Sequence, residues 1–235
     1  MPSVKSQKPR SGVVITIDGP AGAGKSTVAK RLAKELGYAY LDTGAMYRAL
    51  TLKALRLKVN LDDEQALIEL AKKTTIDFRF DKGQSLTVLL DGQDVTEAIR
   101  SEEVTKNTFY IARTGGVREI LVSWQRQIGD KNNIVVEGRD TGTVVFPKAN
   151  KKFYLDADFE ERSRRRINEL QGKGLAVNGE ELKNELQTRD DKDLSRSVGP
   201  LKKADDAILI DSTSLTVDEV VSKIFKYIKT DADTS

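Results

Sequence analysis

The sequence predicts an α/β fold in which helices cover both faces of a five-stranded parallel sheet. Two observations carry this prediction: five short apolar runs recur along the 235 residues, and most segments between them show helical periodicity. The predicted strands are 13–18, 38–42, 134–137, 152–156 and 207–211, and each ends on an acidic residue. Ligands of open parallel sheets bind outside the carboxyl ends of the strands, so these acids are candidates to hold metal-bound water, although each could simply cap the following helix.

Directly after the first strand, residues 19–26 read Gly-Pro-Ala-Gly-Ala-Gly-Lys-Ser, which fits G-x-x-x-x-G-K-S. Glycines allow backbone N–H groups to turn around a phosphate, and the helix predicted over 27–36 presents its positive end to the same anion. Lys25 can reach the β- and γ-phosphates, and the Ser26 hydroxyl can ligate Mg²⁺. A glycine-rich turn beside a lysine also arises by chance, but a strand before it and a helix after it favour a phosphate-binding loop.

The second predicted strand leads into residues 41–48, Leu-Asp-Thr-Gly-Ala-Met-Tyr-Arg, which face the phosphate loop across the sheet edge. If the helix starts near Gly44, Thr43 and Tyr47 lie one turn apart, and with Arg48 they could hold a second anionic ligand. Another cluster, residues 135–143, follows the third strand and includes Arg139 and Asp140. An Arg–Asp surface pair without a functional role is the alternative.

Residues 74–100 break the alternation of strands and helices. The period-two pattern of Ile76, Phe78 and Phe80, a turn at 81–84 and a second apolar run at 86–90 predict a small antiparallel β insertion. A surface excursion with no role is the alternative. At the other end of the chain, residues 216–219 form a capping box that opens an amphipathic helix. Its apolar side, assigned to the core, comprises Val217, Val220, Val221, Ile224, Phe225 and Ile228.

Two basic helical stretches lie between 157 and 200, around Gly172, Gly174 and Gly179. Runs of charge are most often solvated helix faces. In a chain that binds polyphosphate, however, clustered arginines favour a mobile lid that neutralises transition-state charge and excludes water. We therefore expect an arginine-rich lid over 157–200.

Composition excludes several chemistries. The chain has no histidine and no cysteine, so catalysis by histidine, thiolate nucleophiles, disulfides and histidine- or cysteine-ligated metals are ruled out. Phosphoryl transfer survives, because it depends on positioning and charge neutralisation. A net charge of +3 gives little support for nucleic-acid binding. No apolar run is long enough for a membrane helix, and residues 1–11 lack the apolar core of a secretory signal.

Together these clusters resemble one family, the bacterial cytidylate kinases, which are nucleoside monophosphate kinases. The resemblance runs nearly end to end, and its most specific stretches are Asp-Thr-Gly-Ala-Met-Tyr-Arg at 42–48 and Gly-Arg-Asp-Thr-Gly-Thr at 138–143. It implies a P-loop kinase core, Mg²⁺, ATP as phosphoryl donor and CMP or dCMP as acceptor. It also implies one domain over 13–230 between tails at 1–12 and 231–235, with 74–100 as the monophosphate-binding insertion.

The resemblance also assigns roles to individual residues. Those expected to bind ATP are Gly19, Pro20, Ala21, Gly22, Ala23, Gly24, Lys25, Ser26 and Thr27, with Ser26 also at the metal. Those expected to bind the acceptor are Thr43, Tyr47, Arg48, Arg118, Arg139, Asp140, Arg189, Asp193 and Arg196. Within this set, Arg118 and Asp140 should read the base, while Arg189 and Asp193 should hold the ribose. Catalysis is expected from Lys25, Arg162, Arg166 and Arg196, with Arg165 also in the lid.

The base assignment has a chemical logic of its own. Cytosine offers an N4 amino donor beside the acceptors N3 and O2, so a carboxylate can accept from N4 while an arginine donates to the other two. Uracil would turn its O4 acceptor toward that carboxylate. Two positions depart from the family: Phe109 stands where a serine usually contacts the base, and Gly115 replaces a usual proline.

Three alternatives remain open. A small kinase of the same architecture could act on UMP, AMP or a hydroxylated metabolite such as shikimate. A GTPase-like switch would need Asn-Lys-x-Asp, and Asn150-Lys151 continues instead as Lys152-Phe153. A nucleic-acid-binding role for the arginines predicts steep salt dependence of RNA binding. The expectation we carry forward is a cytoplasmic monomer whose partners are ATP and CMP or dCMP, and neither nucleic acid nor a membrane.

Overall fold

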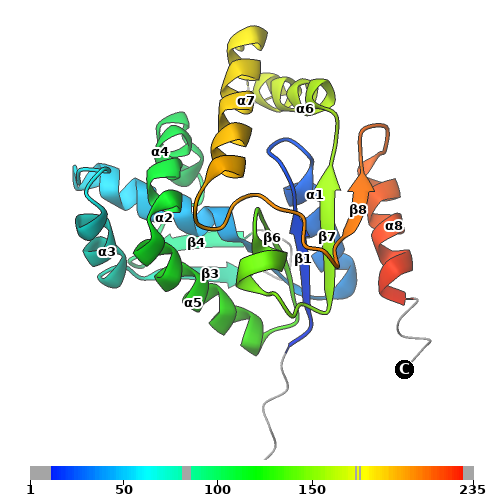
Figure 1. Cartoon of the computed structure of the whole chain (residues 1–235), viewed down its shortest axis with the longest axis horizontal. Coiled ribbons are helices and arrows are strands. Elements are labelled where there is room, and N and C mark those ends of the chain that lie inside the picture. Colours follow the sequence, from blue (N-terminus) through cyan, green and yellow to red (C-terminus); the bar gives the residue numbers. More distant parts are fainter. Residues whose placement is uncertain (1–11, 81–85, 173, 175, 230–235) are drawn as a thin grey trace, which may run out of the picture.

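The computed structural model describes residues 12–80, 86–172, 174 and 176–229. Its central sheet has five parallel strands in the order β2-β6-β1-β7-β8 (Figure 1). In chain order these are β1 (Val14–Asp18), β2 (Ala39–Asp42), β6 (Ile134–Gly138), β7 (Lys151–Asp156) and β8 (Ile208–Asp211). All five predicted strands are confirmed, each with one boundary displaced by one residue. The acidic strand ends therefore do gather at one edge of the sheet, as in the pair Asp42–Glu137.

The helices are α1 (Lys25–Leu36), α2 (Thr43–Arg56), α3 (Glu64–Lys72), α4 (Glu102–Arg113), α5 (Gly115–Lys131), α6 (Phe159–Gly172), α7 (Gly179–Ser195) and α8 (Val217–Lys229). Both faces of the sheet are apolar, which is why the strands read as continuous hydrophobic runs. Ile15 packs into the main core with Val28 and Leu32 of α1, whereas Val14 packs in a second cluster with Ile128 of α5. The helix predicted from residue 27 begins at Lys25, because Gly24 in a left-handed conformation starts it directly.

The predicted β insertion is present. Strands β3 (Ile76–Phe80), β4 (Leu86–Leu90) and β5 (Gln93–Asp94) form a separate antiparallel sheet, followed by the short 3₁₀ helix η1 (Ala98–Arg100). The turn expected at 81–84 lies outside the described residues. The insertion packs against α2.

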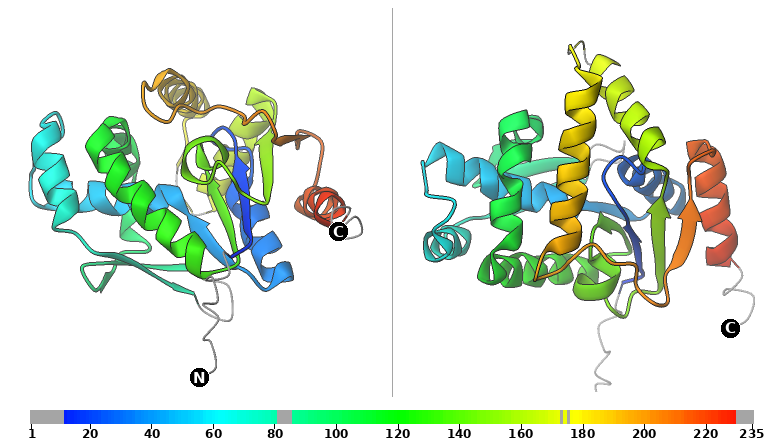
Figure 2. Two further views of the ribbon diagram at one scale, coloured as in Figure 1. Left: turned by 60° about the horizontal axis from the view of Figure 1, so that its bottom comes forward. Right: turned by 45° about the horizontal axis from the view of Figure 1, so that its top comes forward.

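Helices α6 and α7 stand together above the carboxyl edge of the sheet (Figures 1 and 2). They pack against each other, and a chain segment runs from the end of α7 back across that edge to β8. Two helical stretches were predicted here, and both exist.

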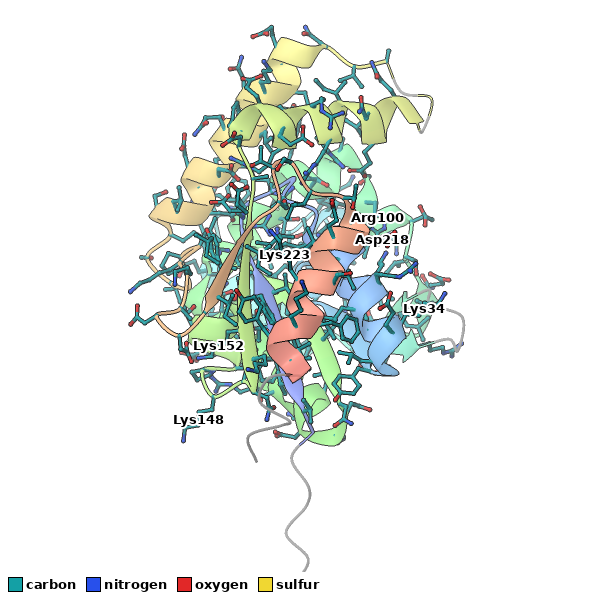
Figure 3. All side chains as sticks on the ribbon, turned by 90° about the vertical axis from the view of Figure 1, so that its right-hand side faces the viewer. Lys34, Arg100, Lys148, Lys152, Asp218 and Lys223 are labelled. Atoms are coloured by element: carbon teal, nitrogen blue, oxygen red, sulfur yellow. The ribbon has the colours of Figure 1, made fainter. Side chains whose placement is uncertain are left out.

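The C-terminal capping box is confirmed: the Thr216 backbone N–H donates to the Glu219 carboxylate, and the Glu219 N–H donates to the Thr216 hydroxyl. Val217 corrects the predicted core, because this first-turn residue is 39% exposed while Val220, Val221 and Ile224 are buried. The outer face of α8 is charged, as Asp218 and Lys223 illustrate (Figure 3). The predicted tails, Gly12 apart, lie outside the described residues. Within the part of the chain that is described, no helix is long and apolar enough to cross a membrane.

Candidate active site

The phosphate loop, residues 19–24, joins β1 to α1 at the carboxyl edge of the sheet (Figure 1). Its turn depends on Gly22 and Gly24, whose φ angles of 78° and 89° favour glycine. Among the described residues no side chain caps the N-terminus of α1, so the N–H groups of its first turn remain for a ligand anion. The predicted residues 19–27 thus form one continuous loop and helix start, shaped to surround a phosphate.

Lys25 lies inside this turn. Its side chain is buried, and its ammonium donates to the Pro20 carbonyl oxygen at 2.6 Å. Burial, reinforced by the positive charge of Arg139, lowers the pKa of Lys25 to about 7. A phosphate group placed in the loop would oppose both effects and hold the lysine in its charged form.

Ser26, in the first turn of α1, contacts the acidic strand end Glu137. The Ser26 hydroxyl donates to Glu137 Oε2 at 2.9 Å, and the Tyr40 hydroxyl donates to Oε1 of the same carboxylate. Burial and the nearby charge of Asp42 raise the pKa of Glu137. Hydroxyl and carboxylate oxygens are the hard donors that Mg²⁺ takes, so this pair fits a magnesium site beside the phosphate loop.

The other acidic strand ends are engaged differently. Asp18 accepts three hydrogen bonds, from the Thr141 N–H at 2.9 Å, the Thr141 hydroxyl at 2.8 Å and the Gly142 N–H at 2.7 Å. These bonds hold the π-helical turn η2 (Thr141–Val145) against β1. Asp42 caps α2 and pairs with Arg48. Asp156 and Asp211 accept from the loops that follow them.

The start of α2 brings Thr43, Tyr47 and Arg48 to the same edge. The Thr43 hydroxyl donates to the Glu137 carbonyl oxygen at 2.7 Å, and Arg48 donates to Asp42 at 2.6 Å. Tyr47 is buried beneath Arg118, whose guanidinium carbon lies 5.5 Å from the ring centroid. The predicted cluster at 43–48 is therefore continuous in space with the arginine predicted to read the base.

Four arginines from separate segments meet here: Arg118, Arg139, Arg189 and Arg196. Asp193 lies among them, accepting from Arg139 Nε at 2.7 Å and standing 3.9 Å from Arg196. Enclosure by surrounding protein and the charge of Arg139 lower the pKa of Arg189 to about 10, although its side chain retains exposed surface. The Nε atoms of Arg48, Arg118 and Arg196 are buried without a hydrogen-bond partner in the described part of the chain. Such a concentration of cationic donors favours an anionic ligand.

Arg118 and Asp140 form a buried ion pair at 3% and 7% exposure. Burial raises the pKa of Asp140, and Arg118 opposes that rise. Gly199 packs directly on the pair: a Cβ at this position would stand 2.6 Å from the Arg118 Cζ. Phe109, which stands at the position where the family usually has a base-contacting serine, contacts two other cations. The centroid of its ring lies 5.1 Å from the Lys192 ammonium and 5.5 Å from the Arg113 guanidinium carbon.

The three arginines of α6 that were predicted to belong to the lid, Arg162, Arg165 and Arg166, lie in different environments. Arg162 is buried and donates to the carbonyl oxygens of Ala157 and Ala21, both at 3.0 Å, and to Asp190. Arg166 pairs with Glu169 one turn along the helix.

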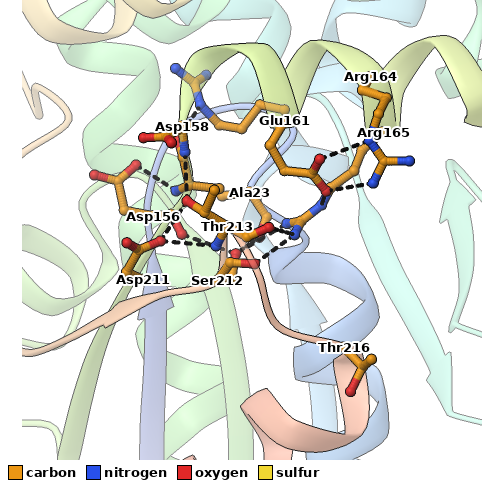
Figure 4. A network of polar contacts seen from close by, with 12 residues as sticks. Ala23, Asp156, Asp158, Glu161, Arg164, Arg165, Asp211, Ser212, Thr213 and Thr216 are labelled. Carbon is orange, nitrogen blue, oxygen red and sulfur yellow. Dashed lines mark hydrogen bonds and ion pairs between the residues drawn. The ribbon is translucent and has the colours of Figure 1, made fainter.

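Arg165 joins Glu161 to the segment after β8 (Figure 4). Its guanidinium donates to the Ser212 hydroxyl at 3.0 Å and the Ser212 carbonyl oxygen at 2.6 Å, and Ser212 in turn donates to the Ala23 carbonyl oxygen. Helix α6 is thus tied to the phosphate loop from two sides. Beside this network lies a cavity of about 520 Å³, lined by Asp158, Glu160, Glu161, Arg164, Ile167, Lys183 and Thr213.

Sequence reasoning missed several residues of this site. It named Asp18 and Glu137 only as members of a set of acidic strand ends, and it did not name Tyr40, Asp190 or Gly199 at all. Asp190 had a usable signal, since it lies inside the Arg189–Asp193 stretch that carries the family resemblance. Tyr40 and Gly199 had none, because their contacts are made with residues about 97 and 59 to 81 positions away.

Comparison with known proteins gives a consistent result. A family model described as Cytidylate kinase matches residues 15–230. A protein named "Cytidylate kinase" from Desulforamulus reducens is 54% identical over 215 residues, covering 92% of this chain and 96% of the relative. One of the same name from Geobacillus sp. (strain WCH70) is 51% identical over 219 residues, covering 93% and 97%. Among solved structures, an uncharacterized protein from Eubacterium ventriosum has a TM-score of 0.53 at 15% identity, covering 93% of this chain and 98% of its own, which shows the fold alone.

Proposed function

The chain belongs to the cytidylate kinase family, and from this premise we propose that it transfers the γ-phosphoryl group of ATP to CMP or dCMP. The products are ADP and CDP or dCDP. The observation that carries the proposal is the meeting of two anion-binding devices at one sheet edge. The phosphate loop supplies backbone N–H groups and Lys25 for a polyphosphate, while four arginines converge opposite it.

The donor half of the proposal assigns ATP to residues 19–27. Lys25 binds the β- and γ-phosphates, and the first turn of α1 receives the phosphate chain. Ser26 and Glu137 would hold Mg²⁺, whose contribution when bound is to neutralise part of the charge on these phosphates. The contact between the Ser26 hydroxyl and a buried carboxylate supports this choice among the five acidic strand ends.

The acceptor half assigns the nucleoside monophosphate to the arginine cluster. Thr43, Tyr47, Arg48, Arg139 and Arg196 surround its phosphate, and Arg189 with Asp193 holds the ribose. Asp140 accepts from N4 of cytosine, and Arg118 donates to N3 and O2. Three buried arginine Nε atoms without partners support an anionic ligand at this place. Residues 74–100 act as the monophosphate-binding insertion.

In the reaction, an anionic oxygen of the acceptor's 5′-phosphate attacks the γ-phosphorus in line, and the bond from that phosphorus to the bridging β-oxygen breaks. No general base is required, because the attacking oxygen carries no proton. Lys25, Arg162, Arg166 and Arg196 stabilise the charge that spreads over the transferred group. Residues 157–200 act as the lid that excludes water.

The GTPase alternative finds no support in the fold. Asn150 precedes β7 and accepts the Val14 N–H at 2.8 Å, at the amino ends of the strands and opposite the phosphate loop. The remaining parts of the proposal are a cytoplasmic location, a monomeric state and action on free nucleotides, with neither nucleic acid nor a membrane as partner.

An acceptor panel tests the function. ADP release is followed by a coupled assay with ATP, Mg²⁺ and each of CMP, dCMP, UMP, AMP and shikimate. We expect turnover with CMP and dCMP, slower turnover with UMP, and none with AMP or shikimate. Faster turnover with AMP or shikimate than with CMP would overturn the assignment. Size-exclusion chromatography with light scattering checks the monomeric state.

A further inference from the structure

Asp190 belongs to α7, between two residues assigned to the ribose, but it faces the phosphate loop. Its side chain is buried, with Oδ1 accepting the Ala21 N–H at 3.3 Å and Oδ2 accepting from Arg162. Arg162 closes this arrangement, since it also donates to the Ala21 carbonyl oxygen at 3.0 Å. Both polar groups of one loop residue are therefore held by a single ion pair that joins α6 to α7.

The neighbouring residues of α7 point elsewhere. Successive helical residues are turned by 100° about the axis, so Arg189, Asp190 and Asp191 face three different directions. Arg189 is exposed to solvent and faces the arginine cluster, where Arg139 and Asp193 are its leading charged neighbours. Asp191 is exposed, and among the described residues its hydrogen bonds lie along its own helix, where it accepts from Gln187 and, through its carbonyl oxygen, from Ser195.

Helix α7 thus contacts the proposed acceptor with one residue and the phosphate loop with the next. The loop also packs tightly on α6, because a Cβ at Gly22 would stand 3.0 Å from the Arg162 Cβ. A shift of the loop on binding polyphosphate would reach the Asp190–Arg162 pair through these contacts, and through that pair the helix that carries Arg189 and Asp193.

We propose that Asp190 is a positioning residue that couples the two nucleotide sites, so that ATP in the phosphate loop tightens the binding of CMP at α7. The proposal rests on the function proposed above, which places the acceptor against Arg189 and Asp193. A coupling of this kind is reciprocal: CMP tightens ATP binding by the same factor.

Three consecutive residues supply the test. Calorimetry measures the Kd of CMP with and without the non-hydrolysable analogue adenylyl imidodiphosphate and Mg²⁺, and the ratio of the two values is the coupling factor. In the unaltered chain we expect a factor of at least about fivefold, the lower end of typical coupling between sites. In Asp190→Asn it should fall below about twofold while the Kd of CMP alone changes little. Asp191→Asn, the matched control, should keep the full factor.

Two results overturn the proposal: a factor below twofold in the unaltered chain, or a factor in Asp190→Asn equal to that of Asp191→Asn. Arg189→Met separates this failure from failure of the acceptor assignment. It should weaken CMP binding both with and without the analogue, and if it leaves the Kd unchanged, the acceptor assignment is the part that is wrong.

Asp190→Asn leaves the buried Arg162 without its charge partner and could unfold the chain. In that event the same measurement is made on Asp190→Leu combined with Arg162→Met, because apolar residues of similar volume often replace a buried ion pair without loss of stability. The coupling factor should again be below about twofold. A factor matching the unaltered chain would contradict the proposal.

Discussion

The proposed ATP-binding half of the site (the donor half) and the proposed CMP-binding half (the acceptor half) differ in how the chain supplies their residues. The proposed donor half, residues 19–27, is one continuous segment that offers a phosphate chain mainly backbone N–H groups and one lysine. The acceptor half takes side chains from α2, α5, the turn after β6, α7 and the segment after α7. The comparison teaches that the proposed polyphosphate site is encoded locally, whereas the proposed acceptor site depends on contacts between residues far apart in the chain.

The largest expected effect is in the donor half. Lys25→Ala should lower kcat about 10³-fold, a loss typical of removing one preorganised charge from a transition state. Lys34→Ala, at the exposed end of the same helix (Figure 3), is the control and should keep the normal rate. The coupled ADP assay measures both, and thermal unfolding checks the fold. Normal turnover by Lys25→Ala would show that the lysine has no catalytic role.

A substitution in the acceptor half should change the selectivity between CMP and UMP. Asp140→Asn replaces an acceptor with an amide that can donate to O4 of uracil, so the ratio of kcat/KM for CMP to that for UMP should fall about 10- to 100-fold. The KM for ATP should stay within about twofold. Asp205→Asn is the exposed control. An unchanged CMP-to-UMP ratio in Asp140→Asn would remove this residue from base recognition.

Glu137 and Asp18 are buried acids at the ends of neighbouring strands, and they should differ in their effect on the Mg²⁺ requirement. Glu137→Gln should raise the Mg²⁺ concentration for half-maximal rate about tenfold, as expected for a group that holds a metal site. Asp18→Asn should leave that concentration unchanged, because its three hydrogen bonds fix the turn η2. Rate measurements over a Mg²⁺ series decide between them. An unaltered Mg²⁺ requirement in Glu137→Gln would exclude the carboxylate from the metal site.

The smallest effect is a pH dependence. With a pKa of about 7 in the free enzyme, Lys25 loses its proton as the pH rises, and its attraction for ATP is lost with it. Therefore kcat/KM for ATP should fall about fivefold between pH 7 and pH 8, while the cation and its contribution are retained below pH 6. Lys25→Arg should flatten this fall, since arginine stays charged. A steep fall that persists in Lys25→Arg would assign it to another group.

The sheet and the glycine-rich loop between β1 and α1 could be predicted from sequence because their signals are local. Apolar runs ending on an acid and a glycine motif between a strand and a helix need no knowledge of distant residues. The buried polar contacts could not be predicted in this way. Nothing near Asp18 indicates that it holds Thr141, and nothing near Tyr40 indicates its bond to Glu137. Val217 was wrongly assigned to the core, because helical periodicity gives the face of the helix on which a residue lies but not whether the core extends as far as the first turn.

The arginines of α6 show the same limit. A charge run predicts many cations but not their partners, so the sequence did not distinguish the buried Arg162, bound to the phosphate loop, from Arg166, which pairs along its own helix. The acceptor arginines were placed through family resemblance, which supplied the long-range information that residue patterns lack.

The central claim is that both substrates lie at one sheet edge with their phosphates face to face. The most direct test is inhibition by a single molecule that carries both nucleosides, cytidine and adenosine joined through five phosphates. The account predicts one inhibitor bound per chain, competitive with ATP and also with CMP. Inhibition competitive with only one substrate, or two inhibitor molecules bound at once, would contradict it.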